Sequence, residues 1–339
     1  MDVVYSQTHL KHAPARFIRL GEWADNPEVP ARAENLVAAA RAAGHRVIAP
    51  DDFGAGPRRA VHGMRHLAFL ESAHRRWVQL DGASVDLVPN THPIRHGGRY
   101  PEGVVGQAGW HVADTACPIG PGSWEAACAS ANVALHAAQL VLDGARVAYG
   151  ICRPPGHHAY DDLSGGFCLL NNIAIAAEHM RTRLSRAAIL NIDVHHGNGT
   201  QGIFYGRGDV LFVSVHADPS AFYPFFTGYG AGRGEGAGEG ANLNLPIDLG
   251  EGDDAYMAAI ERGVAAIRAY QPEALLISLG FDAYVDDPLS PLTVTSGGFA
   301  AAGAAVAGLG TPCVLIQEGG YDCKTLGRNL TAFLSGFPG

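Results

Sequence analysis

Short apolar runs alternate along this chain with longer segments of helical periodicity, and this alternation limits the folds that are open to it. The first apolar run is Val3–Tyr5, a helical pattern covers Ala31–Ala43, and a second apolar run follows at Val47–Ala49. The alternation continues as far as Cys313–Ile316. Strand-helix-strand units in this order predict a parallel sheet with helices on both faces. Because no linker, repeat or shift in composition divides the sequence, we expect residues 1–339 to form one α/β domain.

The composition argues against several classes of protein. A hydrophobic content of 47% with 17% charged residues predicts a large buried core and disfavours disorder. The net charge of −9, without any basic run, disfavours nucleic-acid binding. No apolar run reaches the roughly 18 residues of a membrane span, and no signal-peptide pattern is evident. The six cysteines are scattered without a Cys-x-x-Cys pair, so we expect the protein in a reducing cytoplasm.

In open parallel sheets, ligands bind outside the carboxyl ends of the strands, so the residues that follow each apolar run are the candidates for a site. Four runs are each followed by groups that can bind a metal or move a proton: His157 and His158 after Val147–Ile151, Asp193 and His195 after Ala188–Ile192, Asp282 after Ala274–Leu279, and Tyr321 after Cys313–Ile316. Any one of these would be weak evidence, but together they predict a site at this edge of the sheet.

A metal site is the first prediction from these residues. Asp193 and His195 are two positions apart, so on an extended backbone both side chains point to the same side. With Asp282 they offer two oxygen ligands and one nitrogen ligand and leave positions open, as catalytic metal sites do. This set suits zinc, and also iron(II) or cobalt. The plainer alternatives are a polar loop for Asp193 and His195 and a turn aspartate for Asp282.

The remaining candidates suit proton transfer. A stiff Pro-Pro-Gly turn precedes His157 and His158, so both imidazoles can face one pocket from irregular backbone. Near a metal, they can accept a proton from water and return one to a leaving amine. Tyr321, which follows two glycines, can donate its hydroxyl to a substrate carbonyl. A surface loop and a packing tyrosine are the plainer alternatives.

Longer motifs carry a resemblance to a known family. The chain resembles the zinc-dependent histone deacetylases and acetylpolyamine amidohydrolases of the arginase/deacetylase fold, and within them the bacterial acetylpolyamine amidohydrolases. The resemblance implies a single-domain, three-layer α/β/α fold with a mostly parallel sheet of about eight strands. The motifs, which agree in order and spacing from about Val3 to the C terminus, are Arg153-Pro-Pro-Gly-His-His-Ala159, Gly165-Gly-Phe-Cys168, Asp193-Val-His-His-Gly-Asn-Gly-Thr-Gln201, Gly280-Phe-Asp282, Glu318-Gly-Gly-Tyr321 and, for the bacterial enzymes, Pro121-Gly-Ser-Trp-Glu125.

The resemblance also implies roles for individual residues. The three candidate ligands would bind one zinc ion. His158 would be the main general base and acid, with Asn198 as its partner, and His157 would assist electrostatically. Tyr321 would polarise the scissile carbonyl.

The substrate tunnel and the assembly are further expectations from the resemblance. Gly166 and Phe167 would form one wall of the tunnel, with Phe225 or Phe226 opposite. The stretch around 86–121 would be an inserted loop that closes the tunnel in a homodimer.

Family members often carry a potassium or sodium ion near the Asp193 loop, held largely by backbone carbonyls, with Ser214 as a candidate side-chain ligand here. One departure lies beside it. In many relatives the residue two before the first ligand is an aspartate that orients the first histidine of the pair, and here it is Asn191. A neutral partner does not hold a positive charge on His157, so we expect that imidazole to have a lowered pKa and to be neutral.

A second departure concerns specificity. Where the polyamine enzymes place acidic residues near the tunnel rim, this chain offers Val105 and Ala116, with Glu102 or Asp114 as candidates to compensate.

The expected function is removal of acetyl groups from small acetylated amines, with acetylpolyamines as the leading substrates. Lysine deacetylation, or hydrolysis of other N-substituted amides including xenobiotic ones, is the first alternative. A non-catalytic binder of acylated amines is the second.

Overall fold

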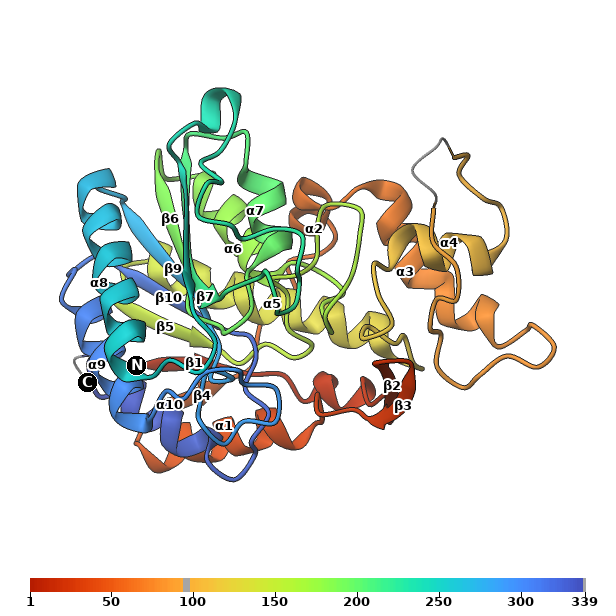
Figure 1. Ribbon diagram of the computed structural model, residues 1–339, viewed down its shortest axis with the longest axis horizontal. Coiled ribbons are helices and arrows are strands. Elements are labelled where there is room, and N and C mark those ends of the chain that lie inside the picture. The colour runs from red at the N-terminus through yellow and green to blue at the C-terminus, as the bar shows by residue number, and fades with distance from the viewer. Residues whose placement is uncertain (94–97, 338–339) are drawn as a thin grey trace.

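The computed structural model describes residues 1–93 and 98–337. Eight strands in this part of the chain form one parallel sheet, which confirms the predicted α/β class (Figure 1). The strands are β1 (Asp2–Val4), β4 (Arg46–Ile48), β5 (Val147–Gly150), β6 (Ala187–Asn191), β7 (Val210–Ala217), β8 (Asn242–Ile247), β9 (Ala274–Leu279) and β10 (Cys313–Gln317). Their order across the sheet is β4-β1-β5-β10-β9-β6-β7-β8. A separate antiparallel hairpin is formed by β2 (Arg16–Arg19) and β3 (Glu22–Asp25).

Helices cover the sheet, and α3 and α4 lie beyond it on the opposite side of the molecule from α8 (Figure 1). They are α1 (Ala31–Ala42), α2 (Gly56–Val61), α3 (Met64–Trp77), α4 (Val104–His111), α5 (Ser123–Leu142), α6 (Asn172–Arg181), α7 (Asn198–Phe204), α8 (Asp253–Tyr270), α9 (Ser296–Ala307) and α10 (Leu326–Leu334), with 3₁₀ turns at Gln7–Lys11 and Gly236–Gly238. Among the described residues, no helix is both long enough and apolar enough to cross a membrane.

The two faces of the sheet belong to two separate hydrophobic cores. Val3 and Tyr149 pack in the core that includes α1, α8, α9 and α10. Their neighbours Val4 and Ala148 pack in the core that includes α3, α5 and α6. Successive strand residues point to opposite faces, so a strand covered on both faces must be apolar at every position. This is why the strands were recognisable as unbroken apolar runs, and it gives the three layers that the sequence predicts.

The segment 86–121 was expected to be an inserted loop, and it is partly helical. It contains α4, and its two ends are joined by backbone hydrogen bonds between Leu87 and Ile119. Residues 94–97 lie outside the described part of the chain. Figure 1 shows α3 and α4 together in a lobe on the opposite side of the molecule from α8. Closure of a tunnel by this segment stays a prediction.

The four strands that precede the candidate site residues are neighbours in the sheet. β5 pairs with β10, β10 with β9, and β9 with β6. Because all of them are parallel, their carboxyl ends lie along one edge, and the segments that follow them converge there although the chain visits them far apart in sequence.

Candidate metal and catalytic site

Asp193, His195 and Asp282 meet beyond the ends of β6 and β9. Their ligand atoms lie within 4.8 Å of one another, and all three side chains are buried. Nδ1 of His195 lies 3.0 Å from Oδ1 of Asp193 and 3.1 Å from Oδ2 of Asp282. The other carboxylate oxygens accept backbone N–H groups, Asp193 from Gly319 at 2.8 Å and Asp282 from Val194 at 3.0 Å. The backbone therefore fixes both carboxylates with one oxygen directed at the imidazole.

The electrostatics of this cluster fit a cation. Burial would lower the pKa of His195, but its hydrogen bonds to Asp193 and Asp282, together with their charges, raise it to about 10. Burial, and then the charge of Asp193, raise the pKa of Asp282. Two buried carboxylates that repel each other and hold a proton on an imidazole form a site in which a divalent ion would balance the same charges. The donor set and its charge therefore fit zinc.

Glu318 was quoted in a motif but given no role by the sequence, and the structure shows what it does. With His157 and Cys168 it forms a second group of metal-type atoms within 4.8 Å. Its carboxylate is already bonded, however: it accepts the backbone N–H groups of Gly156 at 2.6 Å and His157 at 3.2 Å, and the hydroxyl of Ser278 at 3.0 Å. Glu318 thus ties the end of β10 to the loop after β5 and positions the histidine pair.

His157 and His158 lie side by side, with ring centroids 4.0 Å apart. Nδ1 of His157 is 3.0 Å from Oδ1 of Asn191, and Nδ1 of His158 is 2.6 Å from Oδ1 of Asn198. An amide oxygen only accepts, so we assign the proton of each ring to Nδ1, which leaves Nε2 free to accept another. Burial lowers the pKa of His157 to about 4 and that of His158 well below its usual value.

A neutral His157 agrees in direction with the expectation from Asn191. Its cause is mainly desolvation, followed by the charge of His195, and the hydrogen bond to Asn191 acts in the opposite direction. The neutrality of the amide is therefore only part of the physical reason.

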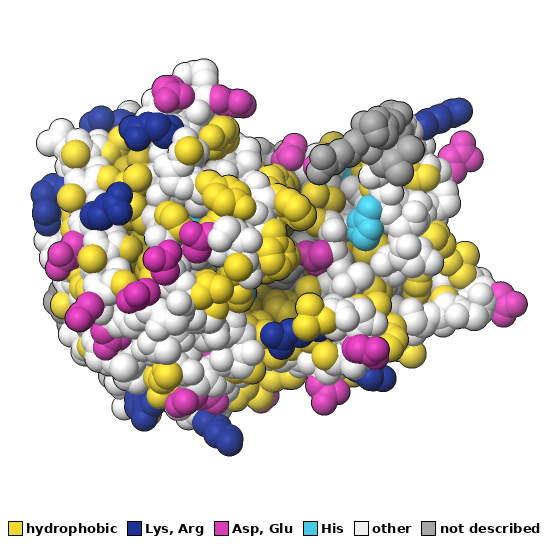
Figure 2. Space-filling model, viewed as in Figure 1, with side chains coloured by type: hydrophobic (Ala, Val, Ile, Leu, Met, Phe, Trp, Pro, Cys, Tyr) yellow, Lys and Arg dark blue, Asp and Glu magenta, His cyan; other side chains and the backbone are white. Residues whose placement is uncertain are grey.

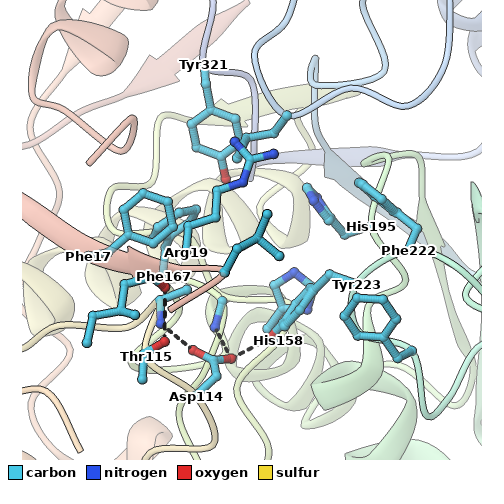
Figure 3. Close-up of a pocket in the computed structure, with 16 residues that line it drawn as sticks. Phe17, Arg19, Asp114, Thr115, His158, Phe167, His195, Phe222, Tyr223 and Tyr321 are labelled. Carbon is cyan, nitrogen blue, oxygen red and sulfur yellow. Dashed lines mark hydrogen bonds between the residues drawn. The ribbon is translucent and has the colours of Figure 1, made fainter. Parts of the chain in front are cut away.

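A cavity of about 400 Å³ leads to these groups, with His158, His195 and Tyr321 among the residues that line it. Figure 3 shows the hydroxyl of Tyr321 directed into this cavity. The backbone N–H of Tyr321 donates to Asp287 at 2.5 Å, and the guanidinium of Arg32 lies 4.6 Å from the centre of its ring. The backbone and the ring of Tyr321 are therefore both held, while its hydroxyl is left directed into the cavity.

The walls of the cavity are largely aromatic. Phe167 packs between Phe17 and Tyr321, with ring centroids 5.7 and 5.6 Å apart. On the other side, Phe222 stacks on His195 at 5.0 Å and 17°, and Tyr223 stands at right angles to the ring of His158 (Figure 3). Figure 2 shows a hollow between the body of the molecule and the lobe of α3 and α4, bordered largely by hydrophobic side chains.

Of the four predicted tunnel residues, Gly166, Phe167 and Phe225 line the cavity. Phe226 is not among the lining residues, and its side chain is 86% exposed, against 45% for Phe225. The prediction of Phe226 as a wall residue is corrected accordingly. The lining also includes Phe17, Phe222 and Tyr223, which the sequence did not predict, although the aromatic cluster from 222 to 226 was a signal for the last two.

Asp114 was a candidate for an acidic residue at the rim. It lies in the cavity wall, where its carboxylate is hydrogen-bonded to other residues of the wall. Its carboxylate accepts the hydroxyl of Tyr223 at 2.6 Å and the backbone N–H groups of Ala116 at 2.8 Å and Gly166 at 3.1 Å. Burial raises its pKa despite these bonds. Ala116 also lines the cavity, and so does Arg19 from the β2–β3 hairpin, which brings a basic group to this surface (Figure 3). Val105 and Glu102 are not among the lining residues.

Comparisons with known proteins identify the family of this chain. The family model of the histone deacetylase domain matches residues 26–337. An acetylpolyamine amidohydrolase of Burkholderia pseudomallei is 46% identical over 326 residues, which cover 96% of this chain and 95% of that protein. An acetylpolyamine amidohydrolase of Mycoplana ramosa is 37% identical over the full length of both proteins.

Among solved structures, the crystal structure of an acetylpolyamine aminohydrolase from Burkholderia pseudomallei superposes with a TM-score of 0.96. It is 44% identical, and the match covers 99% of this chain and 98% of that one. Sequence, fold and site thus lead to one conclusion: this chain belongs to the histone deacetylase domain family.

Proposed function

We propose that this protein is a zinc-dependent amide hydrolase that removes acetyl groups from small acetylated amines, with acetylpolyamines as its leading substrates. The observation that carries the proposal is the arrangement in one cavity of His158, Tyr321 and the three-ligand cluster at Asp193. It is supported by the acetylpolyamine amidohydrolases that are similar to this chain over nearly its whole length.

Asp193, His195 and Asp282 would hold the zinc ion, and iron(II) or cobalt would suit the same ligands. Zinc in such a site supplies Lewis-acid chemistry, which polarises the amide carbonyl and makes water a stronger nucleophile at neutral pH.

The chain's own residues would manage the protons. Nε2 of His158 takes a proton from the attacking water, and its Nδ1–H stays bonded to Asn198, which keeps the ring in position. The protonated His158 then gives a proton to the departing amine nitrogen. His157, held by Asn191, assists electrostatically, and the hydroxyl of Tyr321 donates to the carbonyl oxygen as negative charge develops on it.

The cavity suits a slender acyl amine. Its volume of about 400 Å³ lies at the small end of ligand sites, and the aromatic rings of Phe17, Phe167 and Phe222 would enclose a methylene chain. The acetyl group would enter between His158 and Tyr321. Among the described residues, the charged side chains that line the cavity besides its histidines are Asp114 and Arg19, and Asp114 is occupied by internal hydrogen bonds.

The proposal is tested by acetate release from acetylputrescine, acetylcadaverine, acetylspermidine and an acetyl-lysine peptide, with the zinc, cobalt and iron(II) forms assayed side by side. We expect metal-dependent turnover that is faster on one of the three small acetylated amines than on the peptide. Asp282→Asn should abolish turnover, whereas Asp286→Asn, which changes an exposed aspartate four residues later in the same loop, should not.

Other outcomes would select the alternatives. Faster turnover of the acetyl-lysine peptide than of all three small acetylated amines would favour a lysine deacetylase. Turnover of none of these amides by any metal form, with tight binding of acetylated amines, would favour the non-catalytic binder and refute the proposal.

We also propose a homodimer that acts in a reducing cytoplasm. All six cysteines carry free thiols, which supports the location. The apolar side chains of Leu20 and Phe226 are 97% and 86% exposed, and burial against a second copy would explain them. Light scattering on the zinc-loaded protein would settle the assembly: a single species of monomer mass at working concentration would refute the dimer.

A further inference from the structure

Asn191 ends β6 in the middle of the sheet and is fully buried, in register with Ser214 of β7. Its side-chain amide is bonded at both ends. Nδ2 donates to the carbonyl oxygen of His195 at 3.0 Å and to Oγ of Ser214 at 3.1 Å, with the carbonyl oxygen of Asp193 3.4 Å away. Oδ1 accepts from Nδ1 of His157 at 3.0 Å.

The orientation of this amide follows from its partners. Two of them are backbone carbonyls, which only accept, so the nitrogen of Asn191 must face them. The hydroxyl of Ser214 can accept from Asn191 because it has its own acceptor in Nδ1 of His216, at 2.9 Å. Nε2–H of His216 in turn donates to the carbonyl of Gly228 at 2.9 Å. Every donor in this buried chain has an acceptor, so this assignment of the amide and of the two imidazoles is self-consistent.

These residues do not fit the monovalent cation that the family resemblance implies at this place. Such an ion would need the backbone carbonyls of the Asp193 loop and the hydroxyl of Ser214. Those oxygens converge here on Nδ2 of Asn191 and are already hydrogen-bonded. The hydrogens of the amide carry partial positive charge and point at the same oxygens, so they would repel a cation.

We infer that the amide of Asn191 takes the place of the structural potassium or sodium ion in this protein. A carboxylate with its cation and a neutral amide both sum to zero charge, so the exchange keeps the charge balance of a buried region where an unpaired charge is costly. The amide nitrogen ties the backbone at Asp193 and His195 to β7, as an ion would. Asn191 is thus a positioning residue that holds the ligand turn without a cation, whatever the substrate is.

The test is a melting-temperature series on the zinc-loaded protein in KCl, NaCl and choline chloride at equal ionic strength. The native protein should melt at the same temperature in all three salts. Asn191→Asp places a carboxylate among these oxygens, so this variant should melt lower in choline chloride and recover saturably as KCl is added. Asn198→Asp makes the same exchange at the partner of His158, away from the carbonyl cluster, and should show no saturable response.

A second measurement keeps the inference falsifiable if Asn191→Asp does not fold. After desalting into choline chloride, elemental analysis of the native protein should find neither potassium nor sodium in stoichiometric amount. One equivalent per chain, or a saturable rise of the native melting temperature with KCl or NaCl, would overturn the inference. Neither readout requires catalysis, so failure here is distinguishable from failure of the proposed function.

Discussion

Gly166 lies against the imidazole of His158 so closely that a Cβ atom on it would stand 2.4 Å from Cδ2 of the ring. The glycine also has a φ of 51°, in the left-handed region that side chains disfavour. A methyl group at this position must therefore displace the histidine or the loop that carries Phe167.

We predict that Gly166→Ala lowers kcat by about 10²-fold, the scale for misplacing a catalytic group by about an ångström. Gly206→Ala is a matched control, because a Cβ there meets nothing within 4 Å. Acetate release under saturating substrate would measure both. Equal kcat for the two variants would show that His158 is not held by Gly166.

Tyr321→Phe removes only the hydroxyl directed into the cavity. The loss of one oxyanion donor costs about 10² to 10³ in kcat, and we expect that decrease with an unchanged zinc content. Tyr270→Phe removes a surface hydroxyl that donates to Gly208 and should leave kcat unaltered. Near-normal turnover by Tyr321→Phe would exclude its role at the carbonyl.

Removal of zinc by a chelator should lower the melting temperature, because the two buried carboxylates of Asp193 and Asp282 are then left with only the His195 imidazole between them. An ion that binds only the folded state at 100 times its Kd contributes about 2.7 kcal/mol. Calorimetry with and without added zinc measures this contribution, and Asp282→Asn should greatly reduce it. A melting temperature that is indifferent to zinc would contradict the assigned ligands.

His62, which lies outside the metal site, should make the stability of the protein depend on pH. Its Nε2 accepts the backbone N–H of Asn171 at 2.9 Å, and its Nδ1–H donates to the carbonyl of Asp161 at 3.2 Å. Burial lowers the pKa of His62 from 6.5 to about 4. On acidification, His62 therefore takes up a proton in the unfolded chain at a higher pH than in the folded one. The stability that neutral His62 contributes is complete above pH 6.5 and is lost as the pH falls towards 4.

The shift corresponds to about 3 kcal/mol across this window. In His62→Gln, whose amide oxygen can still accept the N–H of Asn171, the free energy of unfolding should fall less steeply on acidification. Urea titrations at a series of pH values would measure both slopes. Identical slopes in the two proteins would show that His62 does not titrate in this way.

Arg19 should influence the choice of amine, because it brings a positive charge to the cavity that a polycation must enter. Arg19→Glu should raise kcat/KM for acetylspermidine relative to acetylputrescine by roughly three- to tenfold at low salt, and less at high salt. Arg41→Glu makes the same change in net charge on the exposed end of α1 and serves as the control. If the ratio of kcat/KM for acetylspermidine to that for acetylputrescine is the same in both variants, Arg19 does not determine specificity.

The sequence was sufficient for those parts of the fold that local patterns determine. β9 has the predicted bounds, Ala274–Leu279, because a strand buried on both faces reads as one apolar run. The metal and proton-transfer candidates could be identified because parallel strands bring their carboxyl ends to one edge. The roles carried over for them remain predictions until they are measured.

The rest depended on contacts that no local pattern encodes. Phe17 comes from a short hairpin near the start of the chain and meets Phe167 and Tyr321 only in the folded molecule. The role of Glu318 in holding the loop after β5 could not be predicted from neighbouring residues, because its partners Gly156 and Ser278 belong to other segments. Phe225 lines the cavity and Phe226 does not, a difference that the hydrophobicity of two adjacent phenylalanines does not report.

The place of β10 in the sheet has a consequence for biosynthesis. β10 is synthesised after the other seven strands of this sheet, yet it lies between β5 and β9 in its centre. Until residues 313–317 are made, the strands that carry the histidine pair and Asp282 cannot be joined through their common neighbour. A nascent chain can therefore hold no completed site, and chains released before β10 also lack Tyr321, so they should hydrolyse no amide.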